Sequence, residues 1–176
     1  RKGKFIDVVD IATTTKNELA SKMVGRPVDF KVPKQPCKPG DVVLDIQNLT
    51  VLKEKKLTAV DNFSLDVRGG EIVGIAGVDG NGQSELVYAL AGLMPTESGA
   101  IMLDGQDISK MSIRKRAEAG LGHVPEDRQK HGLVLQYSIA ENTVIKSYYT
   151  KEFQRHGFLL RDKITAFAEK IASGFD

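Results

Sequence analysis

The 176-residue sequence contains one cysteine, no tryptophan and no hydrophobic run long enough to cross a lipid bilayer. Cys37 cannot form a disulfide within the chain, and no histidine or second cysteine lies near it in the sequence to complete a metal site. A reducing, cytoplasmic environment is therefore expected. No secretory signal is present at the start, and the chain opens on Arg1 rather than methionine, as a fragment would.

Excess charge of either sign is also missing. The formal net charge of +2 is too small to argue for a nucleic-acid partner. The densest basic cluster, residues 114–116 (Arg-Lys-Arg), is interpreted as the solvent-exposed side of a short helix. With 41% hydrophobic and 27% charged residues, the composition is typical of a soluble globular protein.

The prolines, few in number, are concentrated in one segment. Four of the six lie between Pro27 and Pro39, which predicts a semi-rigid, extended linker over residues 27–40. Before the linker, residues 4–9 are expected to form a strand, and Thr15 is expected to cap a helix that ends at Gly25. Strand and helix are too little to fold alone, so a new domain is expected to begin near residue 41.

The sequence after the linker predicts alternating strands and helices. Apolar residues alternate with polar ones in two half-buried strands, and two continuous apolar runs predict fully buried strands. Turn and capping residues, together with helical periodicity, divide the remainder into a hairpin and four helices. The expected elements are strands at 42–46, 63–67, 71–76, 100–103, 106–108 and 121–124, and helices at 84–91, 112–120, 138 onward and around 164–171.

Residues 77–85 carry the strongest functional signal. Glycines let the backbone curl into a nest of N–H groups around phosphates, and the strand before them and the helix after them provide the context that a phosphate-binding loop requires. The start of that helix offers unpaired N–H groups and a partial positive charge. The predicted site residues in this loop are Gly77, Asp79, Gly80, Asn81, Gly82, Gln83, Ser84 and Glu85.

One position departs from the usual phosphate-binding loop. Gln83 occupies the place of the usual lysine. Two unit charges about 4 Å apart interact by roughly 4 kcal/mol at an effective dielectric near 20, so loss of the lysine ammonium weakens the binding of a triphosphate. Asp79 and Glu85 add negative charge beside the loop. Ser84 still offers a hydroxyl where such loops place a magnesium ligand. Weak nucleotide binding is therefore predicted.

The order of these features resembles an ATP-binding cassette (ABC) domain of a membrane transporter, over residues 41–176. The resemblance rests on the loop together with residues 58–65, 70–77, 90–99 and 101–108. It implies an α/β fold: an incomplete P-loop NTPase core with an antiparallel β subdomain and the start of a helical subdomain. It also implies ATP and Mg²⁺ as cofactors, with Ser84 as the magnesium ligand.

Residues 125–128 (Pro-Glu-Asp-Arg) resemble the version found in importers of simple sugars and nucleosides, and residues 78–86 are closer to the nucleoside branch. In such cassettes the position of Glu126 holds the glutamine that links nucleotide to membrane subunits, which adds Glu126 to the predicted nucleotide-binding residues.

The ATPase subunits of this subgroup resemble two fused cassettes. By this resemblance the domains are residues 1–26, the end of a preceding cassette; 27–40, the linker; 41–125, the β subdomain and P-loop core of the second cassette; and 126–176, a Q-loop-like segment and the start of the helical subdomain.

The resemblance further implies transmembrane permease subunits and a partner ATP-binding cassette as partners, and a peripheral location at the cytoplasmic face of the membrane. A cassette carries two further motifs after the position of Glu126, and this sequence contains neither. They are the Leu-Ser-Gly-Gly-type signature and the strand ending in Asp-Glu that positions magnesium and water. No catalytic residue is assigned, and the chain by itself is expected to be inactive in ATP hydrolysis. Residues 51–56 also lack the aromatic side chain that stacks on adenine.

Two alternatives remain. A P-loop GTPase or kinase would need a base-reading Asn-Lys-x-Asp motif, which is absent, and the Asp-x-x-Gly motif at residues 66–69 precedes the loop instead of following it. The second alternative is a module that has lost nucleotide binding and pairs with the partner cassette and the permease. The transported solute is not specified by these residues.

Overall fold

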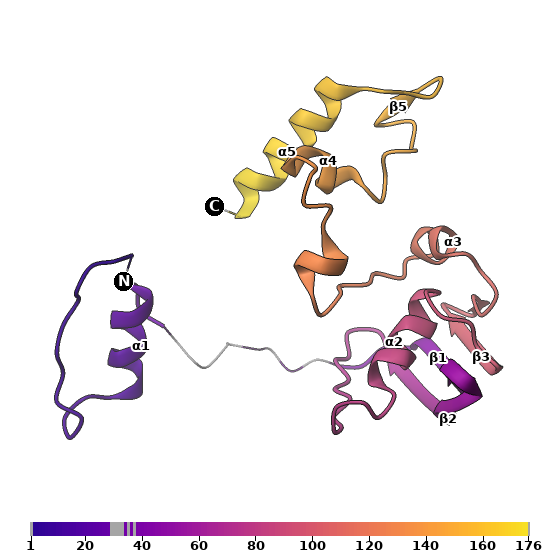
Figure 1. Cartoon of the computed structure of the whole chain (residues 1–176), viewed down its shortest axis with the longest axis horizontal. Helices are drawn as coiled ribbons and strands as arrows, with labels where there is room; N and C mark the ends of the chain where they lie inside the picture. Colours follow the sequence, from indigo (N-terminus) through magenta and orange to yellow (C-terminus); the bar gives the residue numbers. More distant parts are fainter. Residues whose placement is uncertain (1, 29–33, 35, 37, 176) are drawn as a thin grey trace.

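The computed structural model describes residues 2–28, 34, 36 and 38–175. Cys37 and much of the predicted linker lie outside the described residues. The remaining chain forms an N-terminal segment with α1, a part built on an antiparallel sheet, and a C-terminal part that contains α4 and α5 (Figure 1).

Helix α1 (Lys16–Val24) begins and ends where the sequence predicts. Thr15 and Glu18 form a reciprocal capping box, and Gly25 ends the helix in the left-handed conformation. Hydrogen bonds from Thr15 lower the pKa of the Glu18 carboxyl. The strand predicted at residues 4–9 is wrong, because no described strand pairs with this segment, although an ion pair between Lys22 and Asp7 ties it to α1.

The sheet contains four antiparallel strands in the order β2-β1-β3-β4. The paired half-buried strands and the hairpin at Asp104-Gly105 are confirmed, and helix α2 packs on the sheet. The core consists of Ile46, Leu49, Val51, Val60, Leu86, Ala89, Ile101 and Ile108. The elements are β1 (Val42–Lys53), η1 (Glu54–Lys56), β2 (Leu57–Arg68), α2 (Gln83–Ala91), β3 (Ser98–Leu103) and β4 (Gln106–Asp107).

The rest of the chain contains short elements around a second, smaller core. The predicted caps are confirmed: Ser112 begins α3, and Ser138 with Glu141 forms a capping box on α4. Val144, Phe153 and Ile164 form the buried cluster of this part. The elements are α3 (Ile113–Glu118), the π-helical turn η2 (Arg128–Gly132), α4 (Ile139–Val144), β5 (Gln154–Arg155), β6 (Phe158–Leu159) and α5 (Arg161–Phe175).

Two predicted buried strands are absent. Residues 71–76 and 121–124 form no strand, and Ile72 and Val124 are 86% and 92% exposed. A strand of a parallel sheet is stabilised by ladder hydrogen bonds to neighbouring strands, and the described residues provide no such neighbour for either segment. Residues 71–76 are therefore exposed to solvent, whereas in the second segment Leu121 is half-buried against the core and Val124 is exposed. None of the helices that the described residues form has the length and hydrophobicity needed to span a bilayer.

This exposed apolar surface leads to a prediction about the isolated 176-residue chain. We expect it to self-associate, because unpaired apolar segments pair readily with other chains. Size-exclusion chromatography with light scattering should show a mass that rises with concentration. The double variant Ile72→Ser/Ile75→Ser should shift the equilibrium toward monomer, whereas Ile11→Ser, at an exposed position in the N-terminal segment, should not. A wild-type chain that stays monomeric at all concentrations would contradict the expectation.

Candidate functional site

The glycine loop joins residues 71–76 to α2 and is held against the sheet at Gly82. Gly82 is the N-cap of α2, is buried and has a φ of 95°. A Cβ at this position would lie 2.2 Å from the carbonyl oxygen of Ala59 in β2. Glycine is therefore required both by the backbone conformation and by the close approach of β2. The contact fixes where α2 begins.

The first backbone N–H groups of α2 are open to a ligand. Within the described part of the chain, no acceptor is found for the N–H groups of Gln83, Ser84 or Glu85. A Cβ at Gly80 would meet nothing within 4 Å, and the Ser84 side chain is exposed. Free N–H groups and the positive end of the helix dipole favour an anion at this position. The residues present therefore fit a phosphate group.

The side chain of Gln83 lies across the loop. Its Nε2 donates a hydrogen bond of 3.2 Å to the carbonyl oxygen of Val78. A Cβ at Gly77 would lie 2.1 Å from the same nitrogen, so a larger residue there would move the Gln83 amide out of this position. Gln83 supplies a neutral donor where an ammonium group would supply a charge.

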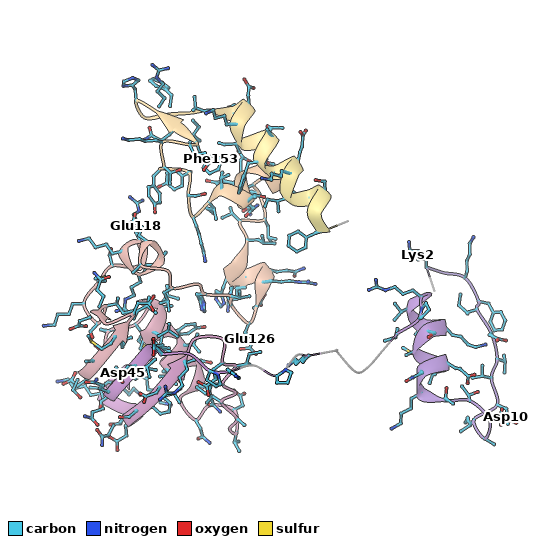
Figure 2. All side chains as sticks on the ribbon, turned by 180° about the vertical axis from the view of Figure 1, so that it is seen from behind. Lys2, Asp10, Asp45, Glu118, Glu126 and Phe153 are labelled. Carbon is cyan, nitrogen blue, oxygen red and sulfur yellow. The ribbon has the colours of Figure 1, made fainter. Side chains whose placement is uncertain are left out.

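The predicted site residues fall into two groups. Residues 77–85 form one continuous loop and helix start, with Asp79 and Asn81 exposed to solvent. Glu126 lies in the connection between α3 and η2, where its side chain is exposed (Figure 2). No hydrogen bond or ion pair of the described residues joins Glu126 to the loop. Eight of the predicted positions, Gly77, Asp79, Gly80, Asn81, Gly82, Gln83, Ser84 and Glu85, are thus contiguous, while Glu126 belongs to a different segment and has no described hydrogen bond or ion pair to them.

The predicted magnesium ligand has little support from neighbouring side chains. No cluster of three or more His, Cys, Asp or Glu side chains that could hold a metal ion occurs among the described residues. A magnesium ion at Ser84 would therefore depend on phosphate oxygens and water for most of its ligands, as Mg²⁺ commonly does in nucleotide sites.

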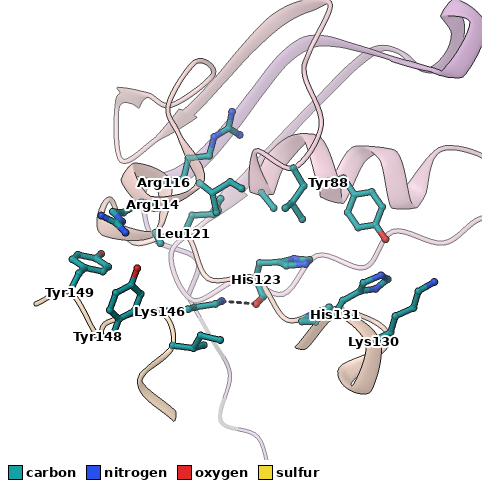
Figure 3. A pocket seen from close by; sticks show the side chains of 16 residues that line it. Tyr88, Arg114, Arg116, Leu121, His123, Lys130, His131, Lys146, Tyr148 and Tyr149 are labelled. Carbon is teal, nitrogen blue, oxygen red and sulfur yellow. Dashed lines mark hydrogen bonds between the residues drawn. The ribbon is translucent and has the colours of Figure 1, made fainter. Parts of the chain in front are cut away.

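A cavity of about 840 Å³, which no sequence motif predicts, lies at the far end of α2 (Figure 3). Its wall combines residues of α2 and α3, the 121–125 segment, η2 and the residues after α4. Apolar side chains such as Leu93, Ile113 and Ile145 share it with the cations Arg114, Lys130 and Lys146. Because the cavity is assembled from segments far apart in the sequence, no local motif signals it.

Two polar contacts link the two sides of this cavity. Lys146 donates from Nζ to the carbonyl oxygen of His123 at 3.2 Å (Figure 3). The Tyr149 hydroxyl donates to Glu118 Oε1 at 2.9 Å, and Arg114 lies 4.0 Å from the centroid of the Tyr149 ring. The hydrogen bond to Glu118 raises the pKa of Tyr149. Helix α3 is thereby connected to the residues that follow α4.

Arg116 corrects the interpretation of the basic cluster as fully solvent-exposed. Arg114 and Lys115 are exposed, but Arg116 is only 4% exposed. Its Nη1 donates to the carbonyl oxygens of Ala89 and Leu90, both at 2.7 Å, and its Nη2 to that of Ser109 at 2.7 Å. Its Nε donates to the carbonyl oxygen of Met111 at 3.0 Å. The acceptors at the end of α2 are 26 and 27 residues away in sequence, which the charge pattern alone does not reveal.

The chain matches one protein family and several importer proteins in sequence. The ABC transporter family model matches residues 60–175. The guanosine import ATP-binding protein NupO of Bacillus subtilis is 47% identical over 100% of this chain, and the nucleoside import ATP-binding protein NupA of Lactococcus lactis is 46% identical over 100%. The ribose import ATP-binding protein RbsA 1 of Agrobacterium fabrum is 36% identical over 100%. The chain spans 34%, 35% and 33% of these relatives, which is about a third of their length.

The fold has counterparts among solved structures. A nucleotide-free ATP-binding cassette from an ABC transporter matches with a TM-score of 0.53 at 18% identity, over 72% of this chain and 46% of that chain. A second ATP-binding cassette of an ABC transporter, MJ1267, matches with the same TM-score over 76% of this chain and 53% of that chain. At this identity the likeness concerns the fold alone, and it agrees with a P-loop NTPase core that carries an antiparallel β subdomain.

Proposed function

Because the chain belongs to the ABC transporter family, we propose that its glycine loop binds the phosphates of ATP and that the chain is part of the ATP-binding subunit of an importer. The observation that carries the proposal is the start of α2, where the N–H groups of Gln83, Ser84 and Glu85 have no acceptor within the described residues. Backbone donors at a helix N-terminus suit a phosphate chain. Gly80 leaves open space beside them.

Binding at this loop is weak and depends mainly on backbone groups. Gln83 contributes a neutral amide, while Asp79 and Glu85 repel phosphate oxygens. Magnesium, held by Ser84 together with the phosphates, would neutralise part of the phosphate charge. Hydrolysis falls mainly to the partner site, and this loop serves as a binding or switching site.

We propose nucleosides as the transported solutes, with simple sugars as the alternative. The two relatives named for guanosine and nucleoside import are 47% and 46% identical to this chain, compared with 36% for the ribose relative. All three match the chain across its whole length, including residues 1–40. This supports the assignment of residues 1–26 to the end of a preceding cassette, followed by the linker 27–40.

The partners we propose are a second ATP-binding cassette and transmembrane permease subunits, with the subunit peripheral to the cytoplasmic face of the membrane. Glu126 and the helices after it contact the permease in this proposal. The 840 Å³ cavity supports it, because it lies between α2 and those helices and combines an apolar lining with cations. A pocket of this kind suits an amphipathic segment that carries acidic groups.

Peptide-resolved hydrogen exchange of the full-length protein tests the nucleotide proposal. Addition of Mg-ATP should slow exchange of the amides in residues 77–86, since phosphates would accept their hydrogen bonds. This local readout separates the loop from any other nucleotide site in the protein. No change in this peptide at saturating nucleotide would contradict the proposal.

The substitution Gln83→Lys should tighten ATP binding about tenfold, because it restores a cation beside the phosphates. The nucleotide concentration that gives half-maximal protection of residues 77–86 measures the effect. Gln106→Lys, which adds the same charge at an exposed position in β4, is the matched control and should leave that concentration unchanged. Equal or weaker binding by Gln83→Lys would count against the electrostatic explanation.

The alternative function is a pairing module without nucleotide binding. One observation favours it: the Gln83 amide already bonds to the Val78 carbonyl across the loop and occupies space beside Gly77. A pairing module would show no protection of residues 77–86 by ATP in either the wild type or Gln83→Lys, while still assembling with its partners. The same hydrogen-exchange measurement therefore separates the two functions.

A further inference from the structure

Arg116 is a buried cation that has no direct contact with the proposed nucleotide loop. It is 4% exposed, and the described residues give its guanidinium no carboxylate in ion-pair contact. A buried charge is costly unless charge-assisted hydrogen bonds compensate it. Here every hydrogen-bond acceptor is a backbone carbonyl oxygen, four of which accept from its three nitrogens, and Asp107 adds a favourable Coulombic interaction without direct contact.

Two of those acceptors form the C-terminal end of α2. Ala89 and Leu90 lie in the last turn of the helix, and each carbonyl oxygen is 2.7 Å from Nη1. The last carbonyl groups of a helix lack intrahelical partners and carry partial negative charge, so a cation at this end is stabilising. The other two acceptors, Ser109 and Met111, belong to the connection between β4 and α3. Arg116 therefore links the end of α2 to that connection.

The helix is also shaped to receive this side chain. Gly92, the C-cap of α2, faces the guanidinium, and a Cβ there would lie 3.0 Å from Arg116 Nε and 3.3 Å from Cζ. The opposite end of α2 is fixed by the contact between Gly82 and Ala59. The nine-residue helix is a rod about 13 Å long, so both of its ends are anchored by close contacts.

We propose that Arg116 is a positioning residue for phosphate binding: it holds α2 along its axis, so that the amides at the start of the helix stay in place for the anion. This inference rests on the proposed nucleotide function. Without the guanidinium, the C-terminal anchor is lost, and the helix shifts or frays until its N–H groups no longer converge. Misplacing oriented donors weakens the binding of an anion even when no contact to that anion is removed.

The test compares three variants in the full-length protein by hydrogen exchange with Mg-ATP. Arg116→Met removes the charge and keeps most of the side-chain volume. Arg116→Lys keeps the charge but can reach fewer carbonyls, and Lys115→Met removes the same charge at the neighbouring exposed position of α3. The readouts are the ATP concentration for half-maximal protection of residues 77–86 and the exchange of β1 and β2 without nucleotide.

Arg116→Met is expected to raise that concentration by roughly fivefold to tenfold, with Arg116→Lys in between and Lys115→Met unchanged. Exchange of β1 and β2 should stay the same, which separates positioning from general destabilisation. Wild-type affinity in Arg116→Met overturns the inference. If Arg116→Met fails to fold, Arg116→Lys decides: weakened protection supports the inference and wild-type protection overturns it. Absence of protection in the wild type overturns the nucleotide proposal itself, and the inference with it.

Discussion

The substitution Gly82→Ala is expected to abolish protection of residues 77–86 by Mg-ATP and to lower the free energy of unfolding of the sheet by about 3 to 4 kcal/mol. The new Cβ would lie 2.2 Å from the carbonyl oxygen of Ala59 and 3.1 Å from its carbonyl carbon. Both atoms belong to the backbone of β2, which is paired along its length with β1 and cannot rotate away. The start of α2 must therefore move, and the amides of the loop move with it.

Gly105→Ala is the matched control for this prediction. Gly105 also has a positive φ, 76°, but a Cβ there would meet nothing within 4 Å. It should cost only the strain of the left-handed conformation, about 1 to 2 kcal/mol, and should leave nucleotide protection unchanged. Urea unfolding followed by circular dichroism, together with hydrogen exchange, measures both quantities. If Gly82→Ala is as stable as Gly105→Ala and still binds ATP, the contact between β2 and the loop does not position α2.

The parts of this fold that could be predicted from sequence are those that depend on neighbours in sequence. The capping boxes at Thr15 and Ser138 need only a residue three positions away, and the turn at Asp104-Gly105 needs only its own dipeptide. The alternation that predicted β1 and β2 also holds, because these two strands pair directly with each other across a short connection.

The strands predicted at 71–76 and 121–124 show what such local patterns omit. An apolar run is the correct signal for a buried parallel strand, but a strand exists only when another strand pairs with it. The described residues supply no partner, and Ile72 and Val124 are exposed as a result. The same segments would become buried wherever a neighbouring strand is provided.

In the candidate site, too, local features could be predicted from the sequence and long-range contacts could not. The glycine spacing predicted the loop from residues 77–82, and the start of α2 follows from it. The packing of Gly82 on Ala59 and the burial of Arg116 under the end of α2 are long-range contacts, across 23 and 27 residues. A basic triplet on a short helix predicts exposure from composition alone. The carbonyl groups that accept hydrogen bonds from the buried Arg116 can be identified only from the packing of α3 against α2.

The second large effect is expected for Phe153→Ala, which should unfold the C-terminal part and leave the sheet intact. Phe153 is 2% exposed, packs with Val144 and Ile164, and its ring lies 5.1 Å from that of Phe167 in an edge-on arrangement. Truncating a buried phenylalanine costs about 3 to 5 kcal/mol. This cluster has only three fully buried members, so the loss exceeds what the remaining contacts can offset.

Hydrogen exchange should then show α4 and α5 nearly unprotected while β1 and β2 exchange as in the wild type, because the two hydrophobic clusters share no residue. Phe158→Ala is the control: the same change at a side chain that is 77% exposed should alter neither part. Since Tyr148 and Tyr149 lie between α4 and Phe153 and line the cavity, loss of this part should abolish binding, at the cavity, of the permease that we propose as a partner. Protection of residues 77–86 by Mg-ATP should persist, since α2 is anchored by β2 and Arg116. A uniform loss of protection in both parts would instead show that the cavity and the nucleotide loop belong to one cooperative unit.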